Sequence, residues 1–63
     1  MKTFIEAFAD TINLPPAKAV EQWAGFSRQL SDQERERIER GGESEGKRMG
    51  EDFNRLYPKE EAQ

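Results

Sequence analysis

Most of the apolar residues of this chain stand in one stretch, FIEAFADTINLPPAKAVEQWAGFSRQL, which covers residues 4–30. Fifteen of the first thirty residues are apolar, against six of the remaining thirty-three, so the N-terminal half supplies most of the core. Within the stretch the apolar positions recur every three or four residues, the spacing that places side chains on one face of an α-helix. The pattern predicts two consecutive helices at the centre of an all-α protein.

The first helix is expected at residues 3–12. Its apolar positions close into one stripe about 140° wide at 100° per residue, formed by Phe4, Ile5, Phe8, Ala9 and Ile12. Thr3 and Glu6 have the spacing of a capping box, in which a hydroxyl and a carboxylate accept hydrogen bonds from backbone N–H groups that lack helical partners. Pro15 and Pro16 end the helix, because proline has no N–H donor and disfavours helical conformation in the residue before it.

A second helix is expected from Pro16 to Leu30, since proline is well accommodated in a first helical turn. Its apolar and small residues cover about half of its circumference, and they are Ala17, Ala19, Val20, Trp23, Ala24, Phe26, Ser27 and Leu30. A face this broad is normally packed on two sides. We therefore expect one side to contact the first helix and the other to contact the C-terminal half or another molecule.

A third helix begins with a second capping-box pattern, Ser31 and Glu34, preceded by Leu30 as a hydrophobic staple. Residues 39–48, however, contain no large apolar residue and include three glycines. A glycine inside a helix costs up to about 1 kcal/mol relative to alanine. One interpretation is therefore a flexible linker over residues 41–46, followed by a short terminal helix.

The alternative is a continuous or kinked helix over residues 32–57. Three acid–base pairs stand in the favourable i, i+4 order, although each contributes only about 0.2–0.5 kcal/mol. In such a helix eight residues fall within about 120° of one face, namely Ile38, Gly42, Gly46, Met49, Gly50, Phe53, Leu56 and Tyr57. The glycines at i, i+4 and i+8 would let another helix approach closely, and burial of the large apolar residues would offset the lost helix propensity.

The length of 63 residues predicts a single domain, either a helical hairpin or a three-helix bundle with a long or kinked C-terminal helix. Domains below roughly 70–80 residues usually need a disulfide, a metal or oligomerisation for stability. The chain has no cysteine, and without histidine it offers a metal only carboxylate ligands. We therefore expect a homodimer and no metal. Pro58 ends the last helix, and residues 58–63 are expected to form a polar tail.

Neither catalysis nor a cofactor is expected. Histidine and cysteine, the most common catalytic acid–base and nucleophilic groups, are absent, and most carboxylates stand in the charged segment 32–40, which is typical of a solvated helix face. The formal net charge of −3 argues against strong binding to nucleic acid, because phosphate-binding proteins normally present a basic face.

Membrane association is not expected either. No apolar run approaches the roughly 20 residues of a membrane span. Glu6 and Asp10 interrupt any signal-peptide hydrophobic region, so a cytoplasmic location is expected.

Protein binding is the function that remains. In the C-terminal half Met49, Phe53, Leu56 and Tyr57 stand at i, i+4, i+7 and i+8, the arrangement of an amphipathic helix that docks in a groove. With Phe26, at the edge of the second helix, they are the predicted partner-binding residues, unless they pack in the protein's own core.

We expect a non-enzymatic interaction module: a small regulator, adaptor or inhibitor of the kind that phages and mobile elements direct against host proteins, by analogy with its size and class. The alternatives are a helix-turn-helix DNA-binding regulator and a structural self-assembly unit. The exposed positions of the second helix fit DNA poorly, being Lys18, Glu21, Gln22, Arg28 and Gln29.

Overall fold

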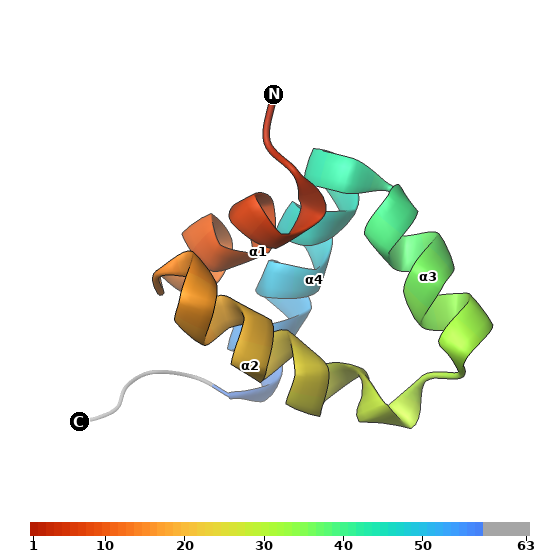
Figure 1. Ribbon diagram of the computed structural model, residues 1–63. Helices are drawn as coiled ribbons and strands as arrows, with labels where there is room; N and C mark the ends of the chain where they lie inside the picture. The colour runs from red at the N-terminus through yellow and green to blue at the C-terminus, as the bar shows by residue number, and fades with distance from the viewer. Residues whose placement is uncertain (58–63) are drawn as a thin grey trace.

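The computed structural model of this chain describes residues 1–57, and this part of the chain is helical and has no strand (Figure 1). Its elements in chain order are α1 (Phe4–Ile12), α2 (Pro16–Phe26), the 3-10 helix η1 (Ser27–Gln29), α3 (Asp32–Arg40) and α4 (Gly42–Leu56). The prediction of an all-helical protein is confirmed. Among these helices none combines the length and the apolar character needed to cross a membrane. The predicted polar tail, residues 58–63, lies outside the described residues.

Both predicted capping boxes are present and set the starts of α1 and α3. The Thr3 hydroxyl accepts a hydrogen bond from the Glu6 N–H at 3.3 Å, and the Glu6 carboxylate accepts one from the Thr3 N–H at 3.0 Å. Ser31 and Glu34 repeat the exchange at 3.2 and 3.1 Å. These local bonds satisfy N–H groups that have no partner within the helix.

The second helix ends earlier than expected. Its α-helical part stops at Phe26, a single 3-10 turn continues to Gln29, and Leu30 is extended. Gly25 and Ser27 are weak helix formers, and the Ser27 hydroxyl donates a 3.5 Å hydrogen bond to the Ala24 carbonyl. A tighter last turn is a common way for such a helix to end.

The chain forms neither the linker predicted over residues 41–46 nor an unbroken helix over residues 32–57. Gly41 remains near helical geometry, whereas Gly42 adopts a left-handed backbone with φ of 68°, and helix resumes at once as α4. A residue with a Cβ would be strained at that φ. The chain reverses direction at this joint and returns along α1 (Figure 1).

The main helix contact of the molecule is between α1 and α4. A Cβ added at Gly46 would collide with the Phe4 carbonyl oxygen and lie 2.8 Å from the Ala7 Cβ, and one added at Gly50 would lie 2.6 Å from the Thr11 methyl carbon. The two backbones therefore approach as closely as glycine allows. Gly42, grouped with these glycines in the sequence pattern, does not take part, because a Cβ there would meet nothing within 4 Å.

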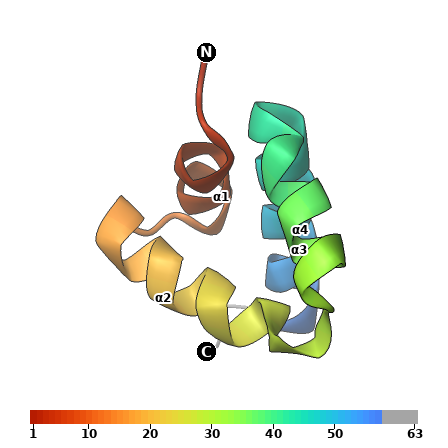
Figure 2. The same ribbon diagram turned by 45° about the vertical axis from the view of Figure 1, so that its right-hand side comes forward.

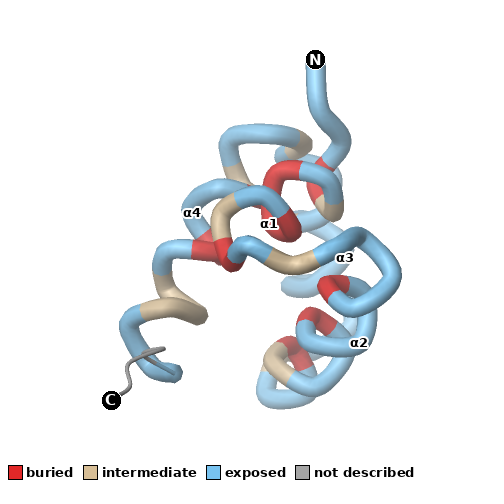
Figure 3. Tube along the Cα trace, turned by 90° about the vertical axis from the view of Figure 1, so that its left-hand side faces the viewer, coloured by how far each residue is buried: buried red, intermediate tan, exposed pale blue. Residues whose placement is uncertain are grey.

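The core lies where α1, α2 and α4 meet, as the buried positions in Figure 3 show. Phe8 is fully buried and contacts Trp23 of α2 and Phe53 of α4 edge to face, with ring centroids 5.6 and 5.8 Å apart. The broad face of α2 thus packs on α1 through Trp23 and on α4 through Phe26. Its outer part stays open, since Val20 is 50% exposed.

α3 is attached more weakly than the other helices. None of its nine residues is buried, and it runs beside α4 (Figure 2). Ile38 is half-buried against the core, and the Glu39 carboxylate accepts a 2.7 Å hydrogen bond from the Trp23 indole N–H. The exposed ion pairs along α3 contribute little, as is usual in water.

Replacing Gly46 by alanine should separate α1 from α4. The added methyl group meets a backbone carbonyl that cannot move aside alone, so we expect the free energy of unfolding to fall by about 1–3 kcal/mol, despite a gain in helix propensity of up to about 1 kcal/mol. Gly25→Ala is the matched control, because a Cβ at Gly25 meets nothing within 4 Å, and it should stabilise the protein. Urea unfolding followed by circular dichroism measures both. Equal stability of the two variants would contradict the close contact.

Candidate protein-binding surface

The structure divides the predicted partner-binding residues between core and surface. Met49 is 9% exposed and belongs to the core, which is the alternative that the sequence left open for it. Phe26 and Phe53 are half-buried. Leu56 and Tyr57 are 62% and 54% exposed, and they are the large apolar side chains of α4 and its C-terminal end that remain available to a partner.

The aromatic members of this set form one connected cluster. The rings of Phe26 and Phe53 lie 5.5 Å apart, and Tyr57 contacts them at 6.3 and 5.0 Å. Because Phe53 also packs on Phe8, the cluster leads from the centre of the core to the surface. Such packing holds the exposed ring of Tyr57 in a defined position.

A hollow of about 240 Å³ opens beside this cluster, between the end of α4 and the segment formed by η1 and α3. Its lining is mostly apolar, with Gln29 and Asp52 as polar members, and the apolar residues are Phe26, Leu30, Ile38, Met49 and Leu56. The terminal apolar face is our name for the surface formed by four of these lining residues and by Tyr57, which packs on Phe26 next to the hollow; its members are Phe26, Leu30, Ile38, Leu56 and Tyr57. Three separate segments of the chain contribute to it.

Leu30 and Ile38 were not among the predicted binding residues. Each has a local signal in the sequence: Leu30 precedes the cap of α3, and Ile38 is the single large apolar residue of that charged helix. Their proximity to Leu56, however, follows from the turn at Gly42, which brings α4 back past α3. A sequence pattern read along one helix does not contain that information.

A second apolar hollow, of about 380 Å³, lies between α1, α2 and α3. Its apolar lining consists of Phe4, Ile5, Val20 and Trp23, and Glu39, which also lines it, accepts the indole hydrogen bond. Val20 is the exposed large side chain here. This hollow thus has less protruding apolar surface than the terminal apolar face.

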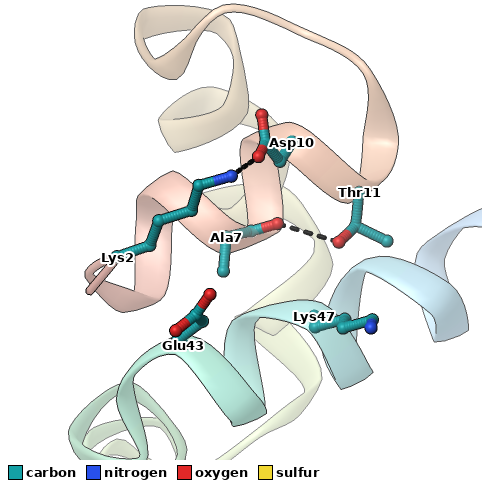
Figure 4. Close-up of a pocket in the computed structure, with 6 residues that line it drawn as sticks. All are labelled: Lys2, Ala7, Asp10, Thr11, Glu43 and Lys47. Atoms are coloured by element: carbon teal, nitrogen blue, oxygen red, sulfur yellow. Dashed lines mark hydrogen bonds and ion pairs between the residues drawn. The ribbon is translucent and has the colours of Figure 1, made fainter.

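The hollow between α1 and α4 is polar (Figure 4). Lys2 pairs with Asp10, and the Thr11 hydroxyl donates a 2.9 Å hydrogen bond to the Ala7 carbonyl. Both members of the ion pair are about half exposed, at 48% and 63%. Charges that open to water in this way form a solvated helix surface, and ion pairs among them are weak.

Across residues 1–57 no group of three or more acidic side chains is placed to hold a metal ion. No protein-family model matches this chain, and neither do the curated proteins or the solved structures with which it was compared. The terminal apolar face is therefore the feature of the molecule from which its function is inferred.

Alanine at Met49 and at Leu56 should have different effects, although the two residues are seven positions apart on one face of α4. Met49→Ala leaves a cavity in the core and should lower the free energy of unfolding by about 2–5 kcal/mol. Leu56→Ala removes a mostly exposed side chain and should change it by about 0.5 kcal/mol or less. Urea denaturation measures both values, and similar losses would show that the assignment of Leu56 to the surface is wrong.

Proposed function

We propose that this protein is a non-enzymatic interaction module that binds another protein through the terminal apolar face. The observation that carries the proposal is the exposure of Leu56 and Tyr57, more than half of each. Leu56 lines the apolar hollow, and Tyr57 packs on Phe26, which lines it too. Large aliphatic and aromatic side chains gathered on one face are costly to leave in water and are typical of interaction sites.

The shape of the face favours a helical segment as the bound element. A volume of about 240 Å³ is smaller than the roughly 300–1,000 Å³ of small-molecule sites. It suits one or two apolar side chains of a partner, as when an amphipathic helix lays anchor residues into a groove. The walls fit this mode, because α4 lies on one side and η1 with α3 on the other.

The rim of the face gives the partner's orientation. Asp52 lines the hollow and pairs with Arg55 at 3.3 Å, and Gln29 stands on the opposite wall. A partner helix with apolar anchors and a flanking hydrogen-bond donor, an arginine or lysine, would complete this polar rim. Rim charges set orientation and association rate more than affinity.

A role as a small cytoplasmic regulator, adaptor or inhibitor fits such a surface, because obstruction of a target requires contact and no chemistry. The comparison with the accessory proteins of phages and mobile elements belongs to the same proposal and rests on size and class alone. Self-association is also part of it, since chains of this length often gain stability by forming dimers.

Capture experiments in a lysate of the source organism test the docking face. The double variant Leu56→Asp, Tyr57→Ser should recover the partner at least about tenfold less than the wild type, because truncation of an interface anchor commonly costs more than 1 kcal/mol. Val20→Asp is the matched control, since it also places a charge on a half-exposed apolar position, but at the other hollow. Circular dichroism confirms that each variant is folded.

Three outcomes show whether the partner binds at the terminal apolar face, at the hollow beside Trp23 or at neither. Loss in the double variant with retention in Val20→Asp supports the terminal apolar face. Retention in the double variant with loss in Val20→Asp would move the site to the hollow beside Trp23. Equal recovery by all three proteins would reject both surfaces.

A further inference from the structure

The joint between α3 and α4 consists of one residue in a left-handed conformation. Gly42 has φ of 68°, while Gly41 has φ of −66° and ψ of −10°, close to helical values. A change of Gly42 to the right-handed region would join α3 and α4 into one helix over residues 32–56. The sequence across the joint contains no proline that would oppose this.

At the joint, backbone N–H and carbonyl groups at the adjacent ends of α3 and α4 lack the hydrogen-bond partners that they would have in an unbroken helix. Gly41, the N-cap of α4, has no side chain to accept a hydrogen bond from the first turn of that helix. At the end of α3 the Gly41 N–H donates to the Ile38 carbonyl at 3.0 Å. In a continuous helix the N–H groups of the first turn of α4 would bond to the last carbonyls of α3. Straightening therefore gains backbone hydrogen bonds.

What opposes straightening is the contact of α4 with α1. Gly46 and Gly50 lie against the α1 backbone, and the Asn54 side chain donates a 2.9 Å hydrogen bond to the Thr11 carbonyl. A straightened chain would carry α4 away and expose the apolar face of α1, including Phe8. Among the described residues, α4 is the element that packs on this face, through Gly46, Gly50 and Phe53.

A second copy of the chain supplies that surface. We propose that the protein forms a dimer by reciprocal exchange of α4, with Gly42 as the hinge and with the α4 of each copy packed on the α1 of the other. The exchange reproduces every α1–α4 contact between chains and changes only the joint, which is the usual energetic basis of domain swapping. α3 stays attached to the α2 of its own chain through the Trp23–Glu39 hydrogen bond.

This dimer is independent of the docking function proposed above. It uses the α1–α4 interface, whereas partner binding uses Leu56 and Tyr57 beyond the end of that interface. The double variant Leu56→Asp, Tyr57→Ser should therefore lose its partner and still exchange. A dimer that is held together by the terminal apolar face would instead dissociate in this variant.

The hinge is tested with three glycine variants, refolded from urea at low and at high protein concentration and measured by light scattering. Gly42→Ala disfavours the left-handed conformation of the joint and favours the helical one. The ratio of straight to bent joints should therefore rise about tenfold at each hinge. Because a dimer contains two hinges, its dissociation constant should fall about a hundredfold relative to the wild type. Gly42→Asn, which tolerates the left-handed region, should stay close to the wild type, and Gly25→Ala should leave the dissociation constant unchanged.

Crosslinking tests the exchange in proteins that keep the wild-type joint. Asp10 on α1 and Lys47 on α4 line the same hollow (Figure 4), and the chain has no cysteine of its own. Asp10→Cys and Lys47→Cys proteins are unfolded, mixed at high concentration, refolded together and treated with a short bismaleimide. We expect a crosslinked dimer containing one chain of each kind, and none from either protein refolded alone.

The proposal is overturned if Gly42→Ala stays monomeric under the conditions in which Gly25→Ala is monomeric. It is also overturned if the mixture gives no crosslink between Asp10→Cys and Lys47→Cys, or if Leu56→Asp, Tyr57→Ser dissociates the dimer. If Gly42→Ala does not fold, the crosslinking result decides alone, because it uses the unaltered hinge.

Discussion

The close approach of α4 to α1 is the contact on which the other features of this structure depend. Gly46 lies against the Phe4 carbonyl and Gly50 against the Thr11 side chain, so no side chain separates the two helices at these points. This short separation lets the Asn54 side chain donate a hydrogen bond to the Thr11 carbonyl and brings the ring of Phe53 into edge-to-face contact with that of Phe8. The glycines lower the intrinsic helix propensity of α4 by up to about 1 kcal/mol each, a cost that burial of Met49 and Phe53 offsets. The helical conformation of α4 thus depends on its packing against α1 and the rest of the core more than on the helix propensity of its own residues.

The same contact explains why one end of the molecule remains apolar and exposed. α1 has nine residues and α4 has fifteen, lengths of about 13 and 22 Å at 1.5 Å per residue. Thr11, near the end of α1, already contacts Gly50 and Asn54. Leu56 and Tyr57 therefore lie beyond the reach of α1, and α3, with Ile38 as its one large apolar residue, supplies too little surface to cover them. The terminal apolar face is a consequence of unequal helix lengths.

The weak attachment of α3 follows from the same arrangement. Once α1, α2 and α4 fill the core, α3 contributes no buried residue to it, and its main contacts are those of Ile38 and the hydrogen bond from Trp23 to Glu39. The glycine joint that reverses the chain is needed because α4 must return along α1, and it leaves the ends of α3 and α4 without mutual hydrogen bonds. A single chain therefore combines an extensive α1–α4 contact with a joint whose helix ends lack mutual hydrogen bonds. The proposed exchange between two copies would keep the contact and pair the helix ends.

The starts of α1, α2 and α3 could be predicted from the sequence because the interactions that define them join residues close together in the chain. The boxes at Thr3 and Ser31 connect residues three apart, and Pro15 and Pro16 act on their immediate neighbours. The spacing of Gly46 and Gly50 likewise indicated a close helix contact. Which helix would make it was not encoded locally.

The joint at Gly42 and the division of the apolar stripe depended on tertiary structure. Met49 and Leu56 are both large, apolar and on one face of α4, so a helical pattern treats them alike. α1 and its neighbours cover Met49 and end before Leu56, and that difference sets one residue in the core and the other on the surface. Similarly, three glycines stand four residues apart, and only the position of α1 decides that two of them form a contact while Gly42 forms the turn. Local spacing identifies the residues that can pack, and the lengths and positions of the neighbouring helices decide which of them do.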